Sequence, residues 1–275
     1  MFPSPEPFDL DCISRALSQR AGFTVQLLAR THSTNQVLLD EAASLTAQPT
    51  ALLALAQSAG RGRRGRVWEN AHPQQSAPAP AAHAFLGSVG VASTAPLAAL
   101  SLLPLYVGVA VARCVQNWGI AARLKWPNDI WVDGAKLAGI LVETAPITAI
   151  TGNAAATAVV MGLGLNWTAA PQIAGKSVCC VADCLPTRPD PVQAAGDLIA
   201  ALHRAYLDCT QGAALAFAAF DALRGVAICT DQGLQGRAVG INTQGHLGLH
   251  TAQGTHWLHS GEVSVQMQPQ NLGQA

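Results

Sequence analysis

The chain has 275 residues, 50% hydrophobic and 12% charged, with 16 basic residues against 16 acidic ones. This length accommodates one large domain, or a large domain with a small companion, and the composition excludes disorder over most of the chain. The balanced charge argues against a surface that binds polyanions over its whole extent, so any anion must be bound by a local cluster of cations.

The first predicted element is a helix over Thr31–Glu41, where Ser33 and its neighbours precede an apolar stretch as capping residues do. Thr50–Ala56 is typical of a buried strand. It leads into Gln57–Arg66, which is predicted to be a loop because three glycines fall within six residues. Ala71–His83, rich in Pro, Ala and Gln, is typical of a flexible insertion.

The most apolar part of the chain is Pro96–Val115. It approaches the length of about 20 residues that a membrane span needs, but Pro104 and Gly108 interrupt it, so a buried core helix is predicted. The strands predicted around it are Phe85–Val91, Ala122–Trp126, Ile130–Val132, Lys136–Glu143 and Thr157–Trp167, with a hairpin turn at Asp133-Gly134.

The sequence pattern changes in the C-terminal part of the chain. Asp190 and Pro191 predict the start of a helix, as cap and first-turn proline, and a second helix is predicted over Ala213–Leu223. After Arg224 the sequence consists of short strand and turn patterns, which favour a small β-barrel. We therefore predict two domains, 1–224 and 225–275.

Two properties of the sequence indicate a cytoplasmic location. Residues 1–15 lack the basic start and apolar run of a signal peptide. The seven cysteines show no paired C-x-x-C spacing, which is typical of reduced thiols. The cluster Cys179, Cys180 and Cys184 has no histidine close by, so no metal site is predicted. We expect a cytoplasmic protein that does not contact a membrane.

Loop 60–66 carries the first cationic cluster. Its glycine spacing matches the dinucleotide-binding fingerprint, but no helix follows, and position 85, where the ribose-binding acid is expected, is Phe. Its four arginines would repel one another, so the loop is expected to be mobile until an anion binds. Guanidinium groups bind phosphate in bidentate fashion. A solvated basic turn is the alternative, and the neighbouring Gln57 and Trp68 favour a binding site.

The second cluster contains two of the chain's three lysines, Lys125 and Lys136. A lysine on a rigid strand can hold its charge against a carboxylate or an α-phosphate. An ordinary hairpin is the alternative for this segment alone. With loop 60–66, here the arginine loop, in the same chain, a binding site for an anionic substrate is favoured.

Five motifs occur in order: Ser33-Thr34-Asn35, GRGRRGR at 60–66, KWPND at 125–129, KLAGILVE at 136–143 and GLGLN at 162–166. In this combination the chain resembles the biotin–protein ligases, from about Thr31 to Asn166. The resemblance implies an α/β (α+β) fold. Its catalytic domain would have the mixed sheet of the biotin and lipoate ligases, which is class II synthetase-like, and a small SH3-like β-barrel would follow.

The resemblance also implies a two-step reaction. Biotin and MgATP would give biotinyl-5′-adenylate, and biotin would then pass to a lysine of the biotin carboxyl carrier protein of acetyl-CoA carboxylase. ATP and Mg²⁺ would be substrates, with no permanently bound cofactor. The implied catalytic residues are Lys136, Arg61 and Arg63. The residues implied to bind biotin or its adenylate are Ser33, Thr34, Asn35, Gln57, Arg61, Gly62, Arg63, Lys136 and Gly139. The residues implied to lie toward the nucleotide are Arg66, Trp68, Lys125, Asn128, Asp129 and Asn166.

Other functions stay open at this point. A lipoate or octanoate ligase or transferase would share the fold but is expected to lack the GRGRRGR loop. A non-catalytic sensor of biotin or nucleotide would need a DNA-reading region to act as a repressor, and a helix-turn-helix module needs about 60 residues. Only thirty residues precede Thr31, so we expect an enzyme that binds no nucleic acid. The resemblance allows a homodimer.

Overall fold

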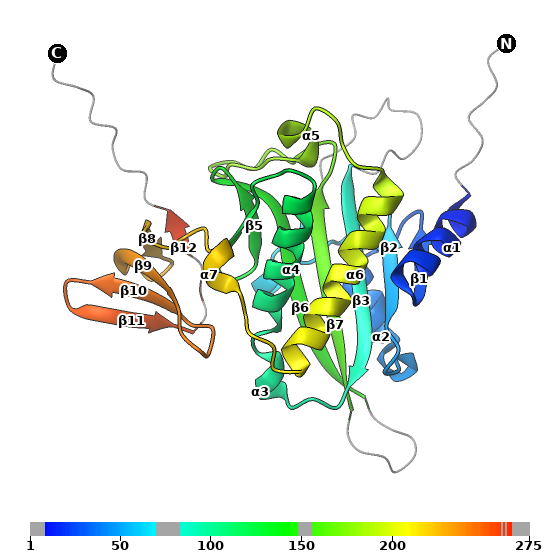
Figure 1. Cartoon of the computed structure of the whole chain (residues 1–275), viewed down its shortest axis with the longest axis horizontal. Helices are drawn as coiled ribbons and strands as arrows, with labels where there is room; N and C mark the ends of the chain where they lie inside the picture. The colour runs from blue at the N-terminus through cyan, green and yellow to red at the C-terminus, as the bar shows by residue number, and fades with distance from the viewer. Residues whose placement is uncertain (1–8, 70–82, 148–155, 260, 262, 266–275) are drawn as a thin grey trace.

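The computed structural model describes residues 9–69, 83–147, 156–259, 261 and 263–265. Its strands form a seven-stranded sheet, here the large sheet, and a five-stranded sheet, here the small sheet (Figure 1). The helices are α1 (Leu10–Ala21), α2 (Thr34–Asp40), α3 (Leu97–Leu100), α4 (Leu103–Asn117), α5 (Val181–Cys184), α6 (Pro191–Thr210) and α7 (Phe217–Phe220), with 3₁₀ turns at Ala42–Ser44 and Arg63–Gly65.

The large sheet has the order β1-β2-β3-β7-β6-β5-β4, with β1 and β2 parallel and the other neighbours antiparallel. It confirms the predicted mixed sheet. Its strands are β1 (Thr24–Leu28), β2 (Thr50–Ala54), β3 (Ala84–Ser93), β4 (Arg123–Lys125), β5 (Asp129–Val132), β6 (Ala135–Ile147) and β7 (Ala156–Asn166).

The two faces of the large sheet have different roles. Helices α4 and α6 cover one face (Figure 1), where Val159 and Met161 of β7 join the main core. Side chains alternate along a strand, so Ala158 and Val160 point to the other face and pack in a second core with Leu38 of α2. Farther along β7, this second face carries the candidate site.

The predicted core helix is confirmed, but it is divided. Leu97–Asn117 is long and apolar enough to cross a membrane by length and composition, and 50% of its most apolar window is buried in the protein. α3 ends at Leu100 and α4 begins at Leu103. Pro104 lies in the first turn of α4, where its missing N–H costs no hydrogen bond, so a new helix starts there.

Two expectations about helices need revision. The predicted helix Ala213–Leu223 is wrong in extent, because α7 is a single turn whose buried residues are Phe217 and Phe220. The chain becomes extended at Asp221, which forms a β-bridge with Leu124, and the N–H of Ala222 donates to the carbonyl of Leu124 at 3.0 Å. At the N-terminus the structure adds α1 and β1, for which no element is predicted from the sequence. Asp9 caps α1 at one end and Gly22, with φ of 77°, ends it at the other.

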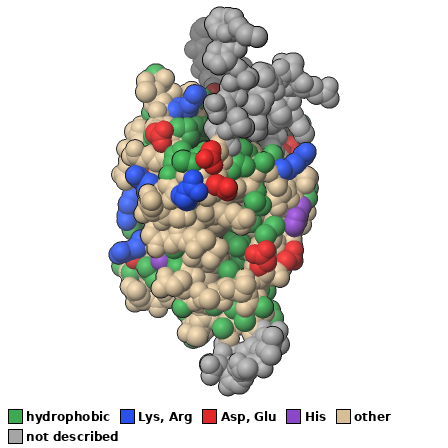
Figure 2. Space-filling model, turned by 90° about the vertical axis from the view of Figure 1, so that its right-hand side faces the viewer, with side chains coloured by type: hydrophobic (Ala, Val, Ile, Leu, Met, Phe, Trp, Pro, Cys, Tyr) green, Lys and Arg blue, Asp and Glu red, His purple; other side chains and the backbone are tan. Residues whose placement is uncertain are grey.

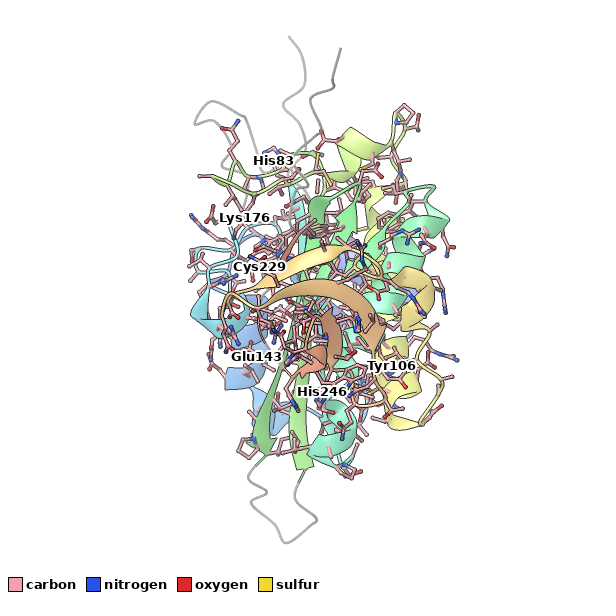
Figure 3. The ribbon with its side chains drawn as sticks, turned by 90° about the vertical axis from the view of Figure 1, so that its left-hand side faces the viewer. His83, Tyr106, Glu143, Lys176, Cys229 and His246 are labelled. Atoms are coloured by element: carbon pink, nitrogen blue, oxygen red, sulfur yellow. The ribbon has the colours of Figure 1, made fainter. Side chains whose placement is uncertain are left out.

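The small sheet has the order β11-β10-β9-β8-β12 and confirms the β-rich, SH3-like C-terminal part (Figure 3). Its strands are β8 (Ala227–Thr230), β9 (Gln235–Ile241), β10 (Leu247–Thr251), β11 (Gly254–Leu258) and β12 (Val263–Val265). A buried hydrogen bond of 3.0 Å from Trp126 Nε1 to the carbonyl of Gly245 joins it to the large sheet. The predicted insertion Ala71–His83 lies outside the described residues except for His83.

The face of the molecule opposite the small sheet has basic and acidic side chains interspersed among neutral ones (Figure 2). This face carries no broad patch of one charge among the described residues. This appearance agrees with the balanced composition.

Candidate active site

A cavity of about 700 Å³ lies on the second face of the large sheet. Its walls come from the start of α2, the arginine loop, the β4–β5 turn, strands β6 and β7, loop 171–178 and β12. Every site residue implied by the resemblance lines it: Ser33, Thr34, Asn35, Gln57, Arg61, Gly62, Arg63, Arg66, Trp68, Lys125, Asn128, Asp129, Lys136, Gly139 and Asn166. The fold therefore brings together segments that are far apart in the sequence, although their individual roles stay predictions.

Glycines form the floor of the cavity. Gly139 of β6 pairs with Gly164 of β7, so both point to the same face. A Cβ atom at Gly164 would lie 2.5 Å from Trp68 Cε2, and one at Gly139 would lie 2.9 Å from Trp68 Cζ3. A Cβ atom at Gly162 would lie 2.1 Å from Asn35 Oδ1. The GLGLN motif thus lets Trp68 and Asn35 lie directly on the sheet.

The start of α2 holds polar groups at one end of the cavity. Ser33 is the N-cap, and its hydroxyl accepts from the backbone N–H of Gln36 at 3.4 Å, as its position before the helix predicts. The backbone N–H of Thr34 donates to Gln57 Oε1 at 2.7 Å. This contact ties the helix start to the residue that opens the arginine loop.

Asn35 is held in one orientation by hydrogen bonds. Its Nδ2 donates to the carbonyl of Leu141 at 3.1 Å and to Glu143 Oε2 at 2.9 Å. Its Oδ1 accepts from the hydroxyl of buried Ser88 at 2.6 Å, and that hydroxyl lies 2.7 Å from Thr34 Oγ1. Because an amide oxygen only accepts, Ser88 must donate to Asn35. Ser88 and Glu143 therefore fix the orientation of the Asn35 amide.

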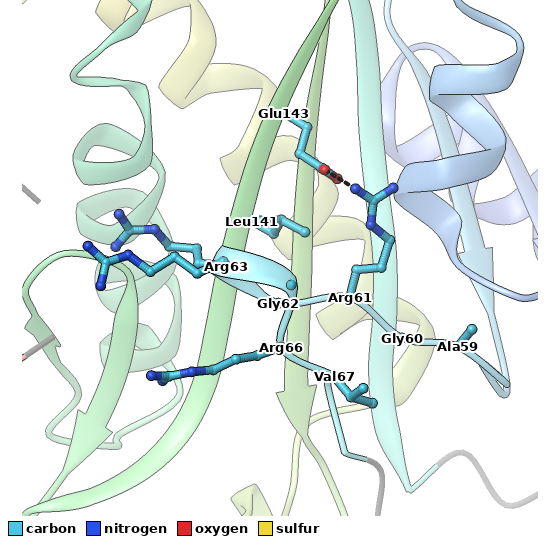
Figure 4. A pocket seen from close by; sticks show the side chains of 11 residues that line it. Ala59, Gly60, Arg61, Gly62, Arg63, Arg66, Val67, Leu141 and Glu143 are labelled. Carbon is cyan, nitrogen blue, oxygen red and sulfur yellow. Dashed lines mark hydrogen bonds and ion pairs between the residues drawn. The ribbon is translucent and has the colours of Figure 1, made fainter. Parts of the chain in front are cut away.

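The arginines do not form one uniform patch. Arg61 points to Glu143, whereas Arg63 and Arg66 point away from Glu143, toward the left of the view (Figure 4). The Arg61–Glu143 salt bridge measures 2.5 Å. Arg63 donates to Asn128 Oδ1 at 3.3 Å, and Arg64 forms a salt bridge of 2.9 Å with Asp231, beyond the end of β8. These partners offset the mutual repulsion expected for the loop.

The second cationic cluster surrounds Asp129. Lys136 forms a 2.8 Å salt bridge with Asp129, and its ammonium also lies 5.5 Å from the centre of the Trp68 ring. Lys125 lies 4.7 Å from the centre of the Trp131 ring. Burial lowers the pKa of Lys125, Asp129 opposes this change, and Lys136 is among the cations that lower it further.

Two asparagines of the motifs hold backbone segments in place. Asn128 Nδ2 donates to the carbonyl of Ile140 at 2.8 Å, which fixes the turn after Lys125 against β6. Asn166 is buried, and its Nδ2 donates to the carbonyl of Cys179 at 3.0 Å. Asn166 therefore positions the segment after β7, in addition to lining the cavity.

Several residues of the site were not singled out from the sequence. Glu143 stands in the quoted KLAGILVE motif, and strand alternation from Gly139 would have placed it on the cavity face. Ser88 has no such local signal, since only the pairing of β3 with β7 puts it opposite Gly162. Among the described residues, no group of three or more potential metal ligands among His, Cys, Asp and Glu is present.

A family model described as the biotin/lipoate A/B protein ligase family matches residues 27–166. The chain belongs to this family. A second model, the biotin protein ligase C terminal domain, matches residues 224–266 and so includes the small sheet. The membership agrees with the resemblance carried by the five motifs.

Two curated relatives cover the ligase region. The bifunctional ligase/repressor BirA of Escherichia coli K12 is 38% identical over 163 residues, which are 59% of this chain and 46% of BirA. The chain thus spans about half the length of that relative. The biotin–[acetyl-CoA-carboxylase] ligase of Mycobacterium tuberculosis H37Rv is 35% identical over 185 residues, 65% of this chain and 62% of that protein.

The fold of the ligase family is also evident from a solved structure. The biotin protein ligase from Aquifex aeolicus in complex with biotin and ATP superimposes with a TM-score of 0.69 at 20% identity. The match covers 89% of this chain and 99% of the other. Both sheets therefore belong to an architecture already seen in this ligase family.

Proposed function

We propose that the chain is an ATP-dependent biotin–protein ligase, which forms biotinyl-5′-adenylate and transfers biotin to a lysine of the biotin carboxyl carrier protein of acetyl-CoA carboxylase. The observation that carries this proposal is the single cavity into which all five motifs bring side chains. The name of the M. tuberculosis relative supports the choice of biotin and of this carrier.

The α2 end of the cavity suits the head of biotin. The ureido ring is neutral and needs donors and acceptors, which Ser33, Thr34 and Gln57 supply. The apolar part of biotin needs a nonpolar wall, which Leu141 would form. Trp68, expected from the resemblance to lie toward the nucleotide, packs against Gly139 and Gly164 and would extend this wall to biotin. In this arrangement the biotin carboxylate would point toward the cations.

Adenylation needs positioning and charge rather than a protein nucleophile. A carboxylate oxygen of biotin attacks the α-phosphorus, the bond to the bridging oxygen breaks, and pyrophosphate leaves with the electron pair. Two anions must approach each other, so Arg61, Arg63 and Lys136 would act by offsetting their repulsion. Loss of one such cation should raise the barrier by about 3 kcal/mol.

The finer assignments belong to the same proposal. MgATP would be the nucleotide substrate, with Mg²⁺ held mostly by phosphates and water. The reaction would take place in the cytoplasm, without nucleic acid or membrane, and the domains would divide at residue 224. A homodimer is testable by sedimentation.

The proposal is tested by the intact mass of a biotin carboxyl carrier domain. The domain is incubated with the protein, MgATP and an equal mixture of biotin and lipoate. We expect one biotinyl addition that requires ATP. Lys136→Ala should lose the addition while keeping its circular dichroism spectrum, since Lys136 is exposed to the cavity rather than part of the core.

Two results would contradict the proposal. A lipoyl addition would keep the adenylation chemistry but assign the cavity to a different acyl group. The absence of any addition, together with binding of labelled biotin, would favour a non-catalytic sensor.

A further inference from the structure

The three lysines of this 275-residue chain all line the same cavity. Lys125 comes from β4 and Lys136 from β6, whereas Lys176 comes from the loop after β7. The resemblance to the ligases did not include Lys176. Because the chain has no other lysine, no lysine lies anywhere else on its surface.

Lys176 differs from the other two in its surroundings. Lys136 is paired with Asp129, and Lys125 lies over the Trp131 ring. Lys176 is exposed, and within the described part of the chain it forms no salt bridge. Its ammonium is therefore available to a ligand without breaking an existing ion pair.

The backbone holds Lys176 close to Lys136. The N–H of Lys176 donates to the carbonyl of Ile173 at 3.1 Å, in a turn where Gly175 has φ of 70°. The next residue, Ser177, accepts from the N–H of Lys136 at 2.9 Å, and the N–H of Cys179 donates to the carbonyl of Lys136 at 3.0 Å. This short pairing fixes the loop, which lines the cavity, against β6. Figure 3 labels Lys176.

The charges at this end of the cavity favour the binding of an anion. Lys136, Lys176 and Arg66 all act on Lys125 as like charges, and only Asp129 opposes them there. Such crowding is unfavourable without a bound anion and becomes favourable with one. A nucleoside triphosphate carries several negative charges along one chain, so it can meet more than one of the cations that line this cavity.

We propose that Lys176 binds the β- and γ-phosphates of the nucleotide and stabilises pyrophosphate as it leaves, an assignment that rests on the proposed ligase function. Lys136 lies between the two ends of the site, with its ammonium over Trp68 and its backbone paired with Ser177. An α-phosphate at Lys136 would therefore direct its β- and γ-phosphates toward Lys176. As the bond from the α-phosphorus breaks, the negative charge that develops on pyrophosphate meets this ammonium.

The test compares Lys176→Ala and Lys176→Arg with Arg188→Ala, which removes an exposed cation outside the residues that line the cavity. Lys176→Ala should raise the KM for MgATP and the inhibition constant of pyrophosphate by about tenfold, the usual effect of losing one charge-assisted hydrogen bond. Lys176→Arg should restore most of this loss, and Arg188→Ala should have no effect. Biotin affinity, and transfer from synthetic biotinyl-5′-adenylate, should not change, because neither involves pyrophosphate.

Two outcomes would overturn the assignment. Normal dependence on MgATP and pyrophosphate in Lys176→Ala would remove Lys176 from the phosphate site. Slower transfer from synthetic biotinyl-5′-adenylate, with normal MgATP dependence, would place Lys176 at the acceptor protein instead. Calorimetric titration of wild type and Lys176→Ala with pyrophosphate alone needs no catalysis, so failure of the proposed function is distinguishable from failure of this assignment.

Discussion

Single glycines decide how deep the cavity is. At Gly164 the nearest obstacle is the rigid indole of Trp68, 2.5 Å from the position of a Cβ atom, whereas at Gly90 on the same sheet face the obstacles are methyl groups of Leu45 at 3.1 and 3.2 Å. A flexible leucine can turn aside, but an indole resting on the sheet must move as a whole. The same substitution therefore has different consequences at the two positions.

Gly164→Ala should displace Trp68 and weaken biotin binding by tenfold or more, since overpacking costs about 1–3 kcal/mol. Gly90→Ala is the matched control, with unchanged biotin affinity and at most a small loss of stability. Isothermal titration with biotin measures the first effect and thermal unfolding the second. Equal biotin affinity in wild type and Gly164→Ala would show that the indole does not shape this pocket.

At the scale of elements, the arginine loop is held between the two sheets. Arg61 joins it to Glu143 on the large sheet, and Arg64 joins it to Asp231, which directly follows β8 of the small sheet. Arg64 has φ of 56°, in the left-handed region that non-glycine residues rarely adopt. The turn that aims Arg64 at Asp231 thus carries a conformational cost, which its contacts must offset.

Removal of the Arg64–Asp231 salt bridge should loosen the loop. Both side chains are partly exposed, at 46% and 41%, so the pair contributes at most about 1 kcal/mol. Arg64→Ala and Asp231→Ala should each speed the release of biotinyl-5′-adenylate by up to about fivefold, and the double variant should do no more than either. Rates of release from a preformed complex, at low and high salt, check this coupling. Additive effects of the two substitutions would mean that they act independently.

The elements themselves were predictable to different degrees. The alternation and glycine spacing of β6 and β7 are local properties, and both strands occur where expected. The helix predicted over Ala213–Leu223 is shorter in the structure because helical propensity does not include the bridge that Asp221 forms with the distant Leu124. α1 was missed because its short amphipathic pattern gains stability mainly from packing with β1 and α6, including the salt bridge of 2.7 Å between Arg20 and Asp197.

At the scale of the whole molecule, the junction between the sheets contains a buried carboxyl group. Asp221 is 4% exposed and follows α7, and its Oδ1 accepts from the N–H of Leu223 at 2.8 Å. Its Oδ2 is buried without a hydrogen-bond partner among the described residues. Burial raises the pKa of Asp221 above its ordinary value, although hydrogen bonds from Leu223 and Arg224 lower it. The charged form is therefore a cost to the folded state.

This cost predicts a pH dependence of stability. A raised pKa means that the folded state binds the proton more tightly than the unfolded state, so the contribution of Asp221 is most favourable at low pH and decreases as the pH rises through the raised pKa. Asp221→Asn should therefore increase the Tm at pH 7. Its advantage over wild type should shrink as the pH falls through the raised pKa of Asp221 toward the ordinary pKa of an aspartate.

Paired thermal unfolding of wild type and Asp221→Asn from pH 4 to pH 7 measures the difference directly, with changes at other carboxylates cancelling between the two proteins. A difference in Tm that stays constant with pH would show that Asp221 does not titrate differently in the folded state.

The sequence by itself determined which chemical groups are present and which family they indicate, because motif residues and strand alternation are local properties of the chain. Asn35, Arg63 and Lys136 were recognisable in this way. Only the tertiary structure decided which of them share a cavity and what holds them there. Ser88, Glu143 and Lys176 gained their significance from the pairing of β3 with β7, the partner of Arg61 and the attachment of a loop to β6. Such contacts join residues far apart in the sequence, and no local pattern encodes them.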